Sequence, residues 1–69
     1  MKKLGRGASC DTAIEVALET GCVVERDDEG NVYINHRAKK LAFTFRRHGL
    51  LREARAPYAL VRFVNRLIS

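Results

Sequence analysis

The sequence lacks a long apolar run. No stretch approaches the roughly 20 apolar residues that span a bilayer, and no apolar stretch follows the charged segment Met1–Arg6. We therefore expect neither a membrane-spanning segment nor a signal peptide. A cytoplasmic, reducing environment is the default expectation that follows. Internal repeats are also missing, which argues against a solenoid or a propeller.

Cysteine and histidine are scarce. Cys10, Cys22, His36 and His48 are separated by 11, 13 and 11 residues, whereas structural zinc sites bring their ligands in close pairs. We expect no metal and, in a reducing compartment, free thiols. Pairing of Cys22 with His36 across a hairpin would give the minimum geometry for a thiolate–imidazole pair. The more ordinary interpretation is a buried thiol beside a half-exposed ring.

Signatures of catalysis are weak as well. Gly5 and Gly7 follow no strand, so the phosphate-cradling loop of nucleotide-binding proteins is not formed. Asp27, Asp28 and Glu29 are typical of a turn, and the carboxylates of the N-terminal half have no partner base. We therefore expect no cofactor and no enzymatic activity, because acid–base catalysis needs a water-poor cavity that shifts a pKa.

The chain has room for one small domain. It has 69 residues, of which 46% are apolar, and a core of this size contributes about 3–5 kcal/mol at most. We expect a flexible basic N-terminal arm over residues 1–8 and a single α+β domain over residues 9–69. Ser9 or Asp11 can cap a helix that runs to about Thr20, and Gly21 is typical of its end.

A β-hairpin is expected next. Residues 22–26 and 31–35 are roughly alternating, β-branched runs. Asp27–Gly30 between them has the composition of a turn whose glycine takes the left-handed conformation. If residues 28–30 form the loop, Val24 pairs with Ile34 and Cys22 lies opposite His36.

Residues 36–56 allow two interpretations. A helix from about Arg37 to Arg47 would place Ala38, Leu41, Ala42 and Phe45 on one apolar arc, with Gly49 as its C-cap. A strand would alternate Leu41, Phe43 and Phe45 with polar or small residues. The Ala, Leu and Lys content before residue 43 favours the helix, which we take as the prediction. A short helical turn is expected over Leu50–Arg55.

Pro57 is well placed to begin a final amphipathic helix. Leu60, Val61, Phe63, Val64, Leu67 and Ile68 share one face of it. The predicted order is thus helix, β-hairpin, helix, short turn, helix. Because two strands alone are marginally stable, we also expect a homodimer in which a second copy covers an open strand edge.

Charge is distributed unevenly along the chain. Residues 1–30 hold four basic and seven acidic residues, a net of −3, whereas residues 31–69 hold nine basic and one acidic residue, a net of +8. On the predicted central helix the cations surround Phe43, an arrangement that suits phosphate contacts combined with stacking. The candidate binding residues are Lys39, Lys40, Phe43, Arg46, Arg47, Arg62 and Arg66.

The sequence therefore predicts a small, basic, non-enzymatic regulator of phage or bacterial type that binds DNA or RNA. The alternative is an inhibitor or adaptor whose basic and aromatic face docks on an acidic surface of a larger protein. The cations can also form an ordinary solvated surface. A strand over residues 41–46 would share the aromatic and basic pattern of RNA-binding sheets, but the glycines of that motif are missing.

Overall fold

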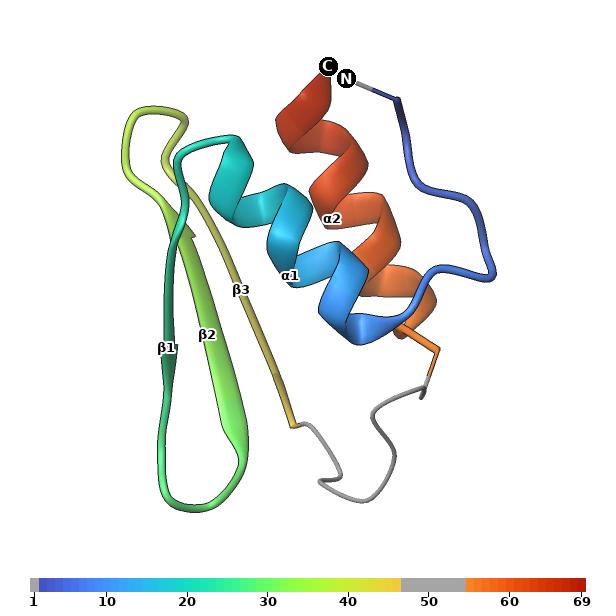
Figure 1. Cartoon of the computed structure of the whole chain (residues 1–69). Helices are drawn as coiled ribbons and strands as arrows, with labels where there is room; N and C mark the ends of the chain where they lie inside the picture. Colours follow the sequence, from blue (N-terminus) through green and yellow to red (C-terminus); the bar gives the residue numbers. More distant parts are fainter. Residues whose placement is uncertain (1, 47–54) are drawn as a thin grey trace.

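The computed structural model describes residues 2–46 and 55–69. The elements in chain order are α1 (Cys10–Glu19), β1 (Val23–Arg26), β2 (Asn31–His36), β3 (Leu41–Arg46) and α2 (Tyr58–Ile68). The strands form one antiparallel sheet in the order β1-β2-β3, and both helices lie against the same face of it (Figure 1). The expected α+β class is confirmed, with a three-stranded sheet in place of a hairpin.

The first helix begins and ends where its capping residues predict. Ser9 is the N-cap, and its hydroxyl accepts a hydrogen bond from the backbone N–H of Thr12 at 3.1 Å. Gly21, just beyond the end of α1, has a φ of 100°, a conformation that side chains with a Cβ rarely adopt. The helix buries Ala13, Ile14 and Ala17 in the core.

The first hairpin has the predicted register, with Val24 paired to Ile34. Its loop is held by Asp27, whose carboxylate accepts hydrogen bonds from the backbone N–H groups of Glu29 and Asn31, the Asn31 side chain and the Tyr33 hydroxyl. The bond from the Asn31 side chain is the largest of the effects that hold the pKa of Asp27 down to about 2, and the bond from Tyr33 comes next. Gly30, with a φ of 86°, completes the turn.

The predicted helix from Arg37 to Arg47 is wrong, because residues 41–46 form β3. This strand pairs with β2 along its whole length, with Phe43 opposite Ile34 and Phe45 opposite Val32. Alternate side chains of a strand point to opposite faces, so both phenylalanines face the helices and their ring centroids are 6.1 Å apart. A helix would have exposed one of these rings, whereas the strand packs both against the core.

The β2–β3 turn explains why the sequence pattern was misleading. It consists of residues 37–40, none of which is Gly, Asn, Asp or Pro. Lys40 has a φ of 54°, so a lysine occupies the left-handed position that glycine or asparagine normally takes. The expected C-cap at Gly49 and most of the expected turn over Leu50–Arg55 lie outside the described residues.

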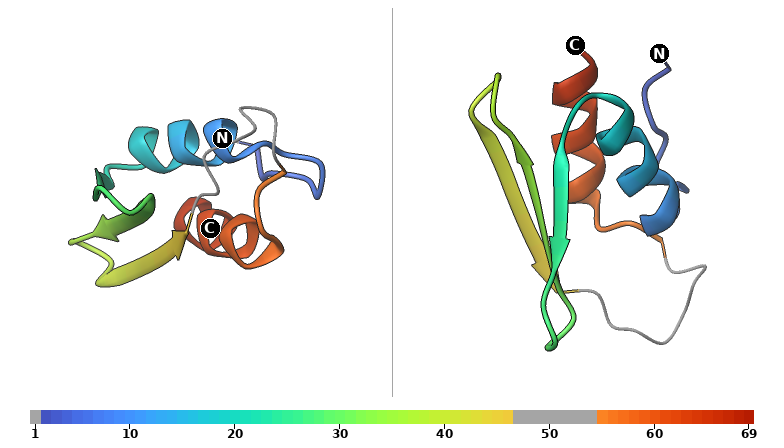
Figure 2. Two further views of the ribbon diagram at one scale, coloured as in Figure 1. Left: turned by 90° about the horizontal axis from the view of Figure 1, so that it is seen from below. Right: turned by 60° about the vertical axis from the view of Figure 1, so that its left-hand side comes forward.

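The final helix is confirmed, with Pro57 as its N-cap and Tyr58 as its first residue. Its apolar face buries Leu60, Val61, Phe63, Val64 and Leu67. Figure 2 shows the two layers from other directions, with the sheet on one side and the helices on the other. In this arrangement α1 contacts β1 and α2 contacts β3.

The basic N-terminal arm lies beside α2 (Figure 1). The Asn65 side chain accepts a hydrogen bond from the backbone N–H of Leu4 at 2.7 Å and donates one to the Leu4 carbonyl at 3.1 Å. The backbone N–H of Ala56 also donates to the Ala8 carbonyl at 2.8 Å. These contacts place the arm along one side of α2, and its flexibility stays a prediction.

Neither α1 nor α2, the helices of the described part of the chain, has the length and apolar character needed to cross a membrane.

Candidate nucleic-acid interface

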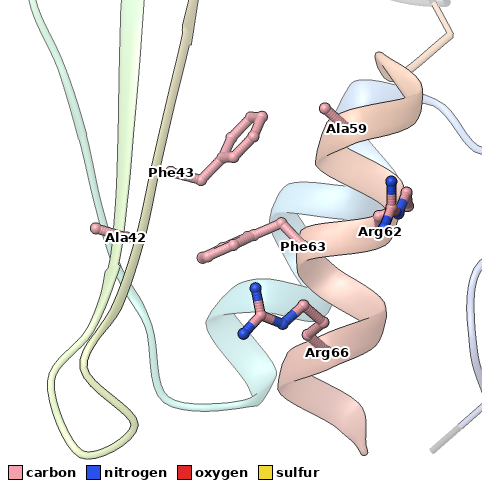
Figure 3. A pocket seen from close by; sticks show the side chains of 6 residues that line it. All are labelled: Ala42, Phe43, Ala59, Arg62, Phe63 and Arg66. Atoms are coloured by element: carbon pink, nitrogen blue, oxygen red, sulfur yellow. The ribbon is translucent and has the colours of Figure 1, made fainter.

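A groove runs between the edge strand β3 and helix α2. It has a volume of about 250 Å³. Phe43 of β3 and Phe63 of α2 form its aromatic part, with ring centroids 5.3 Å apart and ring planes inclined by 30°. Among the described residues, Ala42, Ala59, Arg62 and Arg66 also line it. Figure 3 shows the two rings reaching into this space from the facing elements.

The helical repeat places four residues of α2 on the groove. Positions 59, 62, 63 and 66 follow the i, i+3, i+4, i+7 spacing that defines one face of a helix. Ala59 is small and therefore leaves open the space that a larger side chain would fill. The Arg66 side chain extends from α2 towards β3 (Figure 3). The groove thus combines an aromatic floor with two guanidinium groups.

No carboxylate is built into the two elements that form the groove. Neither β3 nor α2 contains Asp or Glu, and both Arg62 and Arg66 are exposed. Opposite charges a few ångströms away would neutralise such a pair of cations. The charged side chains that β3 and α2 contribute to the groove are therefore all cationic.

A further aromatic residue continues the positive surface along α2. Tyr58, which is 57% exposed, has the Arg6 guanidinium 5.4 Å and the Arg62 guanidinium 6.0 Å from its ring centroid. Both distances are typical of cation–π contacts. We call Arg6, Tyr58, Arg62 and Arg66 the α2 stripe.

The structure brings together three of the predicted binding residues. Phe43, Arg62 and Arg66 meet at the groove. Phe43 is not at the centre of a cationic helix face, as the sequence interpretation had it. It is half-buried against Phe63 because it belongs to a strand.

The other predicted residues lie elsewhere. The Lys39 side chain reaches from the β2–β3 turn to the C-terminal end of α2, where its ammonium group donates a hydrogen bond to the Leu67 carbonyl. The end of a helix is a favourable place for a cation. Lys40 is exposed in the β2–β3 turn. Arg46 is exposed at the far end of β3, on the sheet face turned away from the helices. Arg47 lies outside the described residues.

Sequence reasoning missed Arg6, Tyr58 and Phe63 as site residues. The spacing of Tyr58, Arg62 and Arg66 at i, i+4 and i+8 was available as a signal, because such residues align along one side of a helix. Phe63 was assigned correctly to the apolar face of α2, and its contact with the groove follows only from where β3 lies. Arg6 carries no local signal for its position over Tyr58.

The open face of the sheet is a poor stacking platform. Phe43 and Phe45 point towards the helices, so the outer face of β3 presents Ala42, Thr44 and Arg46 instead. Tyr33 is the aromatic residue that β2 places on this face, and its hydroxyl is hydrogen-bonded to Asp27 at 2.7 Å. That bond raises the pKa of Tyr33 above its usual value. The arrangement therefore differs from an RNA-binding sheet with outward-facing aromatic rings.

Cys22 and His36 are both buried, each with a partner from α1's C-terminal end. The Cys22 thiol lies 3.7 Å from the Thr20 hydroxyl. His36 Nδ1 accepts a hydrogen bond from the backbone N–H of Lys39 at 3.1 Å, so Nε2 carries the proton that it donates to the Thr20 carbonyl at 2.9 Å. Within residues 2–46 and 55–69, no three or more metal-ligating side chains gather at one point.

No protein-family model, curated protein or solved structure matches this chain. The functional conclusion therefore depends on the chemistry of the groove and of the α2 stripe.

Proposed function

We propose that this chain is a small, non-enzymatic nucleic-acid-binding protein that contacts the phosphate backbone with the α2 stripe. The observation that carries the proposal is the arrangement of Arg6 and Arg62 around the exposed Tyr58. Arg66 follows further along α2, at an aromatic groove whose two elements hold no acidic residue. Stripes of arginine interleaved with aromatic rings are typical of surfaces that bind nucleic acid.

The acidic side chains support one orientation of binding. Within the described residues they lie on α1, on β1 and in the β1–β2 loop. They are Asp11, Glu15, Glu19, Glu25, Asp27, Asp28 and Glu29. A phosphate backbone is repelled by these elements and attracted by the α2 stripe, so α2 and the arm beside it form the contact surface.

The guanidinium groups of the α2 stripe suit the phosphates of a nucleic-acid backbone. A guanidinium group donates two parallel hydrogen bonds to phosphate oxygens. Contacts of this kind fix the position of the protein and carry no sequence information. We therefore expect affinity with little base preference.

Charge reversal tests the proposal directly. Arg62→Glu and Arg66→Glu are compared with Arg26→Glu, a control of the same charge change on β1. Fluorescence anisotropy with labelled DNA and RNA oligonucleotides should show a loss of affinity of about tenfold or more for each α2 variant and a much smaller loss for the control. Equal losses for all three variants, or no binding by the unmodified protein, would refute the proposal.

Ionic strength separates this function from a protein-binding inhibitor or adaptor. Neutralising several phosphates gives a slope of log affinity against log salt of about −0.7 to −0.9 per contact. An unmodified protein that binds no oligonucleotide but purifies with one acidic host protein would instead support the adaptor. The homodimer also stays a prediction, which light scattering at micromolar concentration tests.

A further inference from the structure

The aromatic rings of the groove, Phe43 and Phe63, take no part in the phosphate contacts made by Arg62 and Arg66. We propose that the groove accepts one unpaired base, so that the chain binds single-stranded nucleic acid in preference to duplex. This inference rests on the proposed function and adds to it the form of nucleic acid that is recognised.

The dimensions of the groove favour a single ring system. Its volume of about 250 Å³ lies below the range of about 300–1,000 Å³ that is typical of pockets for drug-sized ligands. A whole dinucleotide or an extended cofactor is therefore too large. A flat group that enters between β3 and α2 meets the half-buried Phe43 and the Phe63 ring stacked against it.

The lining favours stacking over base-edge recognition. Ala59 and the two phenylalanines offer apolar and π surfaces, and among the described lining residues the polar side-chain groups are the guanidinium groups of Arg62 and Arg66. Those groups suit the phosphates on either side of an inserted base. Because the described residues that line the groove include no Asn, Gln, Ser or carboxylate, every base has the same favourable contact there, its flat face.

A second stacking surface lies one helical turn away. Tyr58 precedes Arg62 by four residues and is exposed, with arginine side chains near its ring. A strand that places one base in the groove can lay a neighbouring base on Tyr58. Aromatic platforms at successive positions of this kind follow an unstacked strand.

Duplex is a poorer ligand for the same surface. A paired base lies inside the stack and reaches a recess between β3 and α2 only after it is flipped out, which costs a few kcal/mol of stacking and pairing. Duplex therefore gains the contacts of the exposed arginines but not those of the groove. A single strand gains both.

The test compares single-stranded and duplex forms of one oligonucleotide of about 16 nucleotides, made as DNA and as RNA, by anisotropy at constant salt. We expect the single strand to bind about tenfold or more tightly than the duplex. A fluorescent base analogue in the single strand should be quenched on binding, because it stacks on an aromatic ring.

Three variants locate the stacking. Phe43→Leu keeps an apolar side chain but removes the ring from the groove, and Tyr58→Leu removes the exposed ring. Each should weaken single-strand binding by about fivefold or more, and Phe43→Leu should leave duplex binding unchanged because Phe43 is not part of the α2 stripe. Phe45→Leu is the matched control, because Phe45 lies on the same face of β3 but does not line the groove. Circular dichroism verifies that each variant is folded.

The outcomes are distinguishable. Equal binding of both forms, or unchanged quenching and affinity in folded Phe43→Leu, would overturn the inference. If Arg62→Glu still abolishes binding in that case, the proposed function stands and only the preference for single strands is wrong. Absence of binding to every form would refute the proposed function itself.

Discussion

Truncation of the two phenylalanines of β3 is the sharpest test of the fold around the groove. Phe45 is 9% exposed, so Phe45→Ala should cost about 3–5 kcal/mol as a core deletion. Phe43 is half-buried but stacked on Phe63. We expect Phe43→Ala to cost about 2–3 kcal/mol, of which about 1 kcal/mol comes from the aromatic pair.

These losses are large for so small a chain. A domain of 69 residues has a free energy of unfolding of about 3–5 kcal/mol. Phe45→Ala should therefore be largely unfolded at room temperature, and Phe43→Ala should remain folded with a lower midpoint. Urea titration followed by far-UV circular dichroism measures both. Thr44→Ala is the control within the same strand, because the Thr44 side chain is exposed on the outer face and its loss should cost less than about 1 kcal/mol.

An unchanged midpoint for Phe43→Ala would refute the reasoning. It would mean that this ring is not packed against α2, as expected if residues 37–47 were a helix with Phe43 on its solvated side. Equal and large losses for Thr44→Ala would contradict the assignment of the two faces of β3.

Three other variants test local features. Asp27→Asn should be less stable than the unmodified protein above pH 4, and the difference in stability should shrink as the pH falls towards 2. The reason is that the pKa of Asp27 is lowered to about 2 and that the carboxylate's contribution is lost on protonation. Urea titrations across this range that show a constant difference would contradict this prediction. Lys40→Gly should raise the free energy of unfolding by up to about 1 kcal/mol, because glycine adopts a φ of 54° without strain; a lower urea midpoint would be the contrary result. Asn65→Ala removes both hydrogen bonds to Leu4, so trypsin should cleave after Arg6 faster while the thermal midpoint falls only slightly; an unchanged cleavage rate would show that the arm is held otherwise.

Local chemistry predicted the elements whose signals are contained in a few residues. An N-cap at one of two candidates (Ser9, as the structure shows, or Asp11), the glycine after α1 and the register of the first hairpin follow from side chains close together in the sequence. The apolar face of α2 follows from its helical repeat. Each of these was confirmed.

The third strand was considered but the helix was preferred to it, because the determinants of the strand are not local. The turn before it has no glycine or asparagine. Lys40 instead adopts the left-handed conformation that glycine would take without strain. Leu41 and Ala42 favour a helix on propensity alone. Pairing with β2 and packing under α2 outweigh that preference, and neither is visible from residues 37–47 themselves.

The candidate site was predicted in part for the same reason. Arg62 and Arg66 were identified from charge, and Phe43 from its position among cations. Their assembly into one groove depends on β3 lying at the sheet edge beside α2. Lys39 was expected to face a partner, but it binds the end of α2 within the chain.

The buried imidazole of His36 has a consequence for how the molecule folds. One of its nitrogens binds the backbone at the end of α1, and the other binds the backbone of the turn that leads into β3. Both bonds exist only when the helix end and the turn are in place together, so neither segment gains this stabilisation alone. We therefore expect the helix end and the turn to unfold together. β3, which forms one wall of the groove, is therefore positioned in part through α1, although α1 does not line the groove. A change at Thr20 or Gly21 should alter β3 as well.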